Sequence, residues 1–79
     1  MKVKILYFAQ IAEKLGCTTE MFEIPDNMGS EALVDKLKVK YPELNNLTFA
    51  ISVNQTLVQN DTKLEDGFEV ALLPPFAGG

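Results

Sequence analysis

Hydrophobic and polar residues alternate along four stretches of the chain, at residues 2–8, 18–24, 48–53 and 68–73. Alternation with a period of two is typical of half-buried β-strands, in which residues two apart share one face. A fifth, shorter strand is predicted over Thr56–Val58, after a tight turn at Asn54 and Gln55. Glycine is the residue expected at the second position of such a turn, so Gln55 is unusual there.

One longer segment has helical spacing instead. Its apolar residues recur at intervals of three and four, while charged residues occupy the other faces. These apolar residues are Leu33, Val34, Leu37 and Tyr41. We expect Ser30 to cap the start of this helix, Glu31 to lie in its first turn and Pro42 to end it. A short helix is predicted over Ala9–Leu15, ended by Gly16.

The order of elements is strand, short helix, strand, main helix, strand, short strand, strand. A single main helix can cover one face of one mixed sheet, and the first and last strands are apolar enough to lie at its centre. The pattern therefore predicts an α+β fold of the ubiquitin-like β-grasp type, with four to five strands. We expect residues 1–75 to form this domain and residues 76–79 to be a flexible C-terminal tail.

The lysines of the first strand indicate which face of the sheet meets solvent, because lysine is rarely buried. By alternation, several apolar residues share that uncovered face. They are Leu6, Phe8, Ala71 and Leu73, extended by Leu57 and Phe76. An apolar patch of this kind predicts a protein interface. The alternative is that Phe8 ends its strand and packs beneath the short helix.

Composition restricts the chemistry. The 79 residues include no histidine and a single cysteine, Cys17, so an intrachain disulfide is impossible and metal sites are disfavoured. We expect Cys17 to be a small, half-buried side chain. The net charge of −4 argues against nucleic acid and favours a basic protein partner. No apolar run could span a membrane and no signal peptide is evident, so we expect a cytoplasmic protein without a bound cofactor.

The chain ends in Pro-Pro-Phe-Ala-Gly-Gly. The two prolines stiffen the exit from the last strand, and Ala77, Gly78 and Gly79 are small enough to enter a narrow channel. We expect Gly79 to present a free, unhindered carboxylate, which adenylation by ATP would make a good acylating group. The chain lacks a phosphate-binding glycine loop, so another protein would catalyse that step. The alternative is a disordered terminus.

Four segments carry a resemblance to a known family: residues 3–9, 53–58, 64–70 and 74–79. In these segments the sequence resembles the small subunits of molybdopterin synthase, which are ubiquitin-like sulfur carriers. The Pro-Pro-x-x-Gly-Gly ending, the Val-Asn hairpin and the Phe-Ala after the first strand are together fairly specific. Phe68 departs from the family, which often has aspartate there.

The resemblance implies a mechanism. An adenylyltransferase related to ubiquitin activators, consuming ATP, would convert the carboxylate of Gly79 to an acyl-adenylate. A sulfur source such as a cysteine desulfurase would then yield a thiocarboxylate, the 1-thioglycine form of Gly79. The carrier would dock on the large synthase subunit through Phe8, Leu57 and Phe76. Its sulfur would pass to a cyclic pyranopterin monophosphate, within a heterotetramer of two small and two large subunits.

Three alternatives remain open at this point. The chain could carry sulfur for another pathway, such as thiamine synthesis or tRNA thiolation. It could be a protein modifier that is ligated to lysines through Gly79. It could also be a β-grasp interaction module whose tail has no chemical role.

Overall fold

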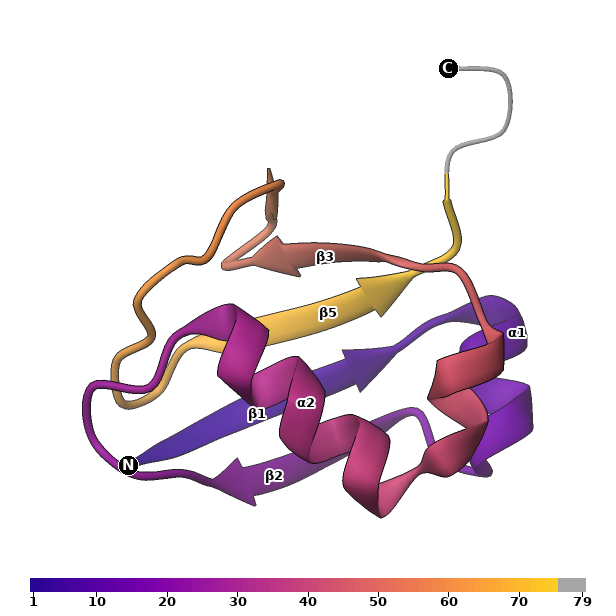
Figure 1. The fold of residues 1–79 in the computed structure, drawn as a ribbon, viewed down its shortest axis with the longest axis horizontal. Helices are drawn as coiled ribbons and strands as arrows, with labels where there is room; N and C mark the ends of the chain where they lie inside the picture. Colours follow the sequence, from indigo (N-terminus) through magenta and orange to yellow (C-terminus); the bar gives the residue numbers. More distant parts are fainter. Residues whose placement is uncertain (76–79) are drawn as a thin grey trace.

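The computed structural model describes residues 1–75, which form a mixed sheet with helices on one face (Figure 1). The elements are β1 (Lys2–Tyr7), α1 (Ala9–Leu15), β2 (Thr19–Glu23), α2 (Ser30–Lys40), the 3₁₀-helix η1 (Pro42–Asn46), β3 (Ala50–Val53), β4 (Thr56–Val58) and β5 (Glu69–Leu73). The strand order is β2-β1-β5-β3-β4. β1 and β5 run parallel, and the other pairs are antiparallel. This is the expected β-grasp arrangement, with the first and last strands inside the sheet.

The core lies between the sheet and α2. β1 and β5 contribute alternate residues to it, as the pattern predicted, and α2 contributes Leu33 and Leu37, about one helical turn apart. The fully buried members are Val3, Ile5, Leu33, Leu37, Val70 and Leu72, each with 0% exposure. Leu44 in η1 and Leu64 in the loop before β5 close the ends of this core at 1% exposure. Sequence spacing did not reveal these two residues, because neither belongs to a regular repeat.

The start of α2 differs from the prediction. Ser30 is the first residue of the helix rather than its N-cap, and its Oγ accepts a hydrogen bond from the Thr62 amide at 2.9 Å. The cap comes from a distant loop: Asp61 Oδ1 accepts the amide hydrogen of Glu31 at 3.0 Å. A Cβ on Gly29, the residue before the helix, would clash with the Asp61 carboxylate. The loop therefore supplies the oxygen that the sequence assigned to Ser30.

The hairpin between β3 and β4 turns at Asn54 and Gln55, as predicted. Both residues have positive φ angles, 49° and 70°. Asn54 is fixed on both sides, because its amide donates to the Glu69 carbonyl at 2.7 Å and its Oδ1 accepts the Glu69 amide at 2.9 Å. The turn is therefore attached to the beginning of β5. Neither α-helix within residues 1–75 has the length and apolar character of a membrane span.

Candidate docking face and tail exit

The face of the sheet that α2 does not cover carries an open hollow of about 460 Å³. We call it the outer hollow. Its lining comes from four strands, the hairpin turn and the residue before α1, and consists of Leu6, Phe8, Ser52, Gln55, Leu57, Glu69, Ala71 and Leu73. Neighbouring strands bring these residues together, since Leu6 is paired with Ala71 and Ser52 with both Ala71 and Leu57. The predicted apolar patch is therefore one continuous surface in the described part of the chain.

Two predicted interface residues are the most exposed apolar side chains of this hollow. Phe8 is 44% exposed and Leu57 is 48% exposed. Phe8 has an extended backbone just before α1 and lies outside the buried core, so the alternative that it packs beneath the short helix is wrong. The other predicted site residues, Phe76, Ala77, Gly78 and Gly79, lie outside the described residues. A role of Phe8 and Leu57 in docking remains a prediction.

The outer hollow adjoins the point where the last strand ends. Leu73, the final residue of β5, lines the hollow, and Pro74 follows it directly. Because β1 and β5 are parallel, their ends reach the same side of the molecule, near α1 (Figure 1). The Phe8 amide also donates to the Leu72 carbonyl at 3.2 Å. The sequence that leads to Gly79 therefore begins beside the most exposed apolar surface of the hollow.

The polar residues of the outer face were not predicted as part of a site. Ser52 faces outward as its parity requires, yet it is only 6% exposed because Leu57 and Ala71 flank it. Glu69 lies directly across from Lys4 on the same face, and this places opposite charges side by side. The face thus has an apolar part near the end of β5 and a charge-balanced part near its beginning.

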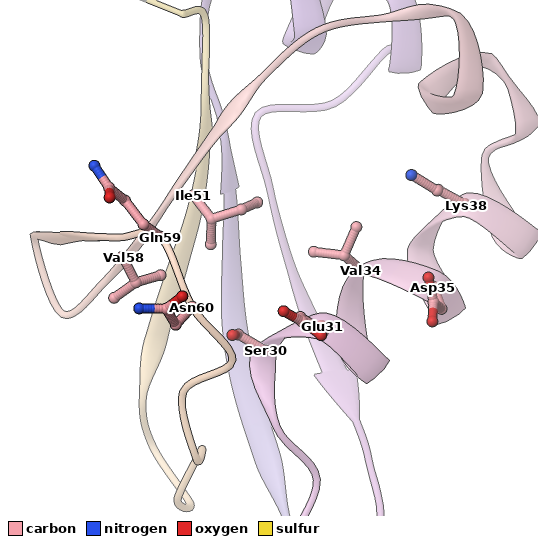
Figure 2. Close-up of a pocket in the computed structure, with 9 residues that line it drawn as sticks. All are labelled: Ser30, Glu31, Val34, Asp35, Lys38, Ile51, Val58, Gln59 and Asn60. Carbon is pink, nitrogen blue, oxygen red and sulfur yellow. The ribbon is translucent and has the colours of Figure 1, made fainter.

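A second hollow lies on the other side of the sheet, between α2 and the β3–β4 hairpin, with a volume of about 330 Å³ (Figure 2). It exists because one helix is too narrow to cover five strands. Val34 and Ile51 point toward each other across it, and Glu31, Asp35 and Lys38 form its helical rim. This rim is charged, and no residue that lines the hollow belongs to β5. We therefore place the candidate site on the outer face.

A polar cluster joins β1, β2 and the end of α2. Glu20 accepts hydrogen bonds from Tyr7 Oη at 2.6 Å, Tyr41 Oη at 2.8 Å and Lys40 Nζ at 2.6 Å. Burial by itself would raise the pKa of Glu20, but these three donors hold it below its ordinary value of 4.5. Burial and the Glu20 carboxylate raise the pKa values of Tyr7 and Tyr41. The tyrosines therefore stay protonated, and the cluster holds the end of β1 that leads into Phe8.

Cys17 and the acidic side chains are the remaining groups that could react or bind a metal. Cys17 is half-buried, as expected, with its Sγ 3.8 Å from Tyr41 Oη. Within residues 1–75, no three His, Cys, Asp or Glu side chains gather closely enough to hold a metal ion. The candidate site within residues 1–75 is therefore the outer hollow beside the end of β5.

Comparison with known proteins agrees with this geometry. Residues 5–79 match the ThiS family. The chain is 36% identical to the molybdopterin synthase sulfur carrier subunit of Chlamydomonas reinhardtii, over 100% of both chains. Its fold matches SAMP1 of Haloferax volcanii with a TM-score of 0.84 at 21% identity, over 100% of both chains. It also matches, with a TM-score of 0.71 and 30% identity over 100% of both chains, a structure from Helicobacter pylori described as the complex of subunits 1 and 2 of molybdopterin-converting factor. The chain therefore belongs to the ThiS family, together with sulfur carrier subunits of molybdopterin synthase.

Proposed function

We propose that this chain is the sulfur carrier subunit of a molybdopterin synthase. The observation that carries the proposal is the position of the outer hollow, which lies directly beside the end of β5. Only Pro74 and Pro75 separate this strand from residues 76–79 in the sequence. A surface that docks on a partner at this point would direct the following residues toward that partner. The full-length similarity to sulfur carrier subunits supports this arrangement.

The chemistry takes place at the carboxyl group of Gly79. A carboxylate oxygen attacks the α-phosphorus of ATP, pyrophosphate leaves, and an acyl-adenylate forms. The terminal sulfur of a persulfide then replaces AMP at the carbonyl carbon. A thiol that breaks the remaining S–S bond releases the thiocarboxylate. The carrier supplies only the carboxyl group, while an adenylyltransferase supplies the ATP site and a cysteine desulfurase supplies the sulfur.

The outer face brings the loaded tail to the large subunit. Phe8 and Leu57 insert their exposed apolar surface into the large subunit, and Phe76 adds an anchor at the root of the tail. The small residues Ala77, Gly78 and Gly79 then reach the partner's active site, which provides all catalytic side chains. There the sulfur passes to a cyclic pyranopterin monophosphate. The complex of two subunits in Helicobacter pylori supports this pairing, and we propose a heterotetramer of two small and two large subunits.

The experiment uses the thiocarboxylated chain, the large subunit and the cyclic pyranopterin precursor, with formation of molybdopterin as the readout. We expect conversion with the intact chain. Deletion of Gly79 should abolish transfer and leave docking largely unchanged, because the docking surface lies on the sheet. Full transfer by the shortened chain would contradict the tail mechanism. Conjugates to lysines of other proteins, without conversion of the precursor, would instead identify a protein modifier.

A further inference from the structure

Gln55 is in a conformation that its residue type disfavours. Its φ angle is 70°, in the left-handed region, where a glycine has no steric penalty and an L side chain does. Two-residue hairpin turns with positive φ at both positions prefer Asn-Gly. The chain follows this preference at the first position with Asn54 and departs from it at the second. A glutamine thus occupies a position where glycine would form the same turn more easily.

The two turn residues differ in what their side chains do. The side chain of Asn54 has an internal role, since it accepts the Glu69 amide hydrogen. In contrast, the Gln55 side chain makes no hydrogen bond to any other residue in the range 1–75 and is exposed. It lines the outer hollow together with Leu57 and Phe8. Backbone strain that brings no internal contact is a feature of functional positions.

We propose that the carboxamide of Gln55 is a recognition group of the docking face and pairs with a backbone peptide group of the large subunit. A carboxamide offers a donor and an acceptor side by side, which match the C=O and N–H of a peptide segment. An anionic ligand is less suited to this place, because the Glu69 carboxylate lines the same hollow and would repel it. The inference rests on the proposed function, since it names a contact of the same interface.

The test measures both stability and docking of the Gln55→Gly variant. Gln55→Gly removes the carboxamide and relieves the strain of the turn, so the urea midpoint of the full chain should stay the same or rise. Docking on the large subunit, measured by titration calorimetry, should weaken about tenfold, because two neutral hydrogen bonds are lost. Gln55→Asn tolerates the left-handed conformation but shortens the arm, and we expect it to weaken docking as well.

The matched control is Asn27→Gly. Asn27 also has a positive φ angle, 68°, but it lies in the loop before α2 and does not line the outer hollow. This variant should dock with the affinity of the unchanged chain.

Two results would overturn the inference alone. One is unchanged docking of Gln55→Gly while Leu57→Ala weakens docking, which would leave the proposed function standing and make Gln55 a mere turn residue. The other is a clear fall in the urea midpoint of Gln55→Gly, which would show that glutamine is not held against the preference of the turn. If neither Gln55→Gly nor Leu57→Ala affected docking, the proposed interface itself would be wrong.

Discussion

The two faces of the sheet differ although the same strands build both. Leu57 and Val58 are neighbours in β4, yet Leu57 points to the outer hollow with 48% exposure, whereas Val58 packs against the buried core. On the inner face α2 removes apolar side chains from water, and this burial stabilises the fold. On the outer face comparable side chains remain in water. The comparison indicates that folding depends on the inner face and docking on the outer face, so substitutions should separate the two properties.

The largest effect is expected on the inner face. Leu37→Ala removes a side chain with 0% exposure from the contact between α2 and the sheet, and should lower the free energy of unfolding by about 2–5 kcal/mol. For a domain of this size such a loss is a large part of the total stability. Urea denaturation followed by circular dichroism measures it.

Val39→Ala is the matched control on the same helix. Val39 is 82% exposed, so the substitution should change the free energy of unfolding of the chain by less than about 0.5 kcal/mol. Equal losses from the two variants would contradict the assignment of the core to the inner face.

The next effect concerns the outer face. Leu57→Ala should weaken docking on the large subunit by about 2 kcal/mol, roughly 30-fold, because an exposed apolar anchor loses its contact with the partner. Its free energy of unfolding should fall by less than about 1 kcal/mol. Titration calorimetry and urea denaturation of the same sample give both values.

Met21→Ala controls for exposure alone. Met21 is 60% exposed and is paired with Lys4, in the charge-balanced part of the outer face. It should leave docking unchanged. A loss equal to that of Leu57→Ala would extend the docking surface beyond the outer hollow.

The Glu20 cluster makes the stability of the fold depend on pH. The pKa of Glu20 is lower in the folded chain than in the unfolded chain, so its contribution is fully present above pH 4.5 and is lost as the pH falls below that value. Glu20→Gln should cost about 1.5 kcal/mol at neutral pH. The difference in unfolding free energy between the two chains should shrink as the pH is lowered to about 3. A difference that stays constant over this range would show that the charge of Glu20 is not what stabilises the cluster.

The smallest effect is expected at the start of α2. Asp61→Ala removes the carboxylate that accepts the Glu31 amide, and should cost about 1 kcal/mol of stability. Docking should not change, because Asp61 does not line the outer hollow. Asp61→Asn keeps an oxygen at the same place and should recover most of the loss. If it recovered nothing, the negative charge rather than the hydrogen bond would be responsible.

Local patterns were sufficient for most of the fold. The faces of β1 and β5 follow from periodicity, because burial on one side of a strand imposes alternation. The bounds of α1 and β4 follow instead from Gly16 and from the turn at Asn54 and Gln55. The cap of α2 could not be found in this way. Its carboxylate comes from Asp61, about 30 residues away, and no local signal marks such a contact.

The candidate site was likewise predicted only in part from the sequence. Phe8 and Leu57 could be assigned to the outer face because parity and strand order are both visible in the sequence. The approach of Tyr7 and Tyr41 to Glu20 could not, since it depends on how α2 crosses the sheet. Gln55 was visible as an unusual turn residue, but only its position beside the outer hollow suggests a role.

The central claim is that the carboxyl group of Gly79 carries the sulfur. The most direct measurement is the intact mass of the full chain after incubation with the adenylyltransferase, ATP and a sulfur source. The account predicts a mass increase equal to the replacement of one oxygen by sulfur, located on Gly79 by fragmentation. An unchanged mass, under conditions that load an established sulfur carrier, would contradict the account.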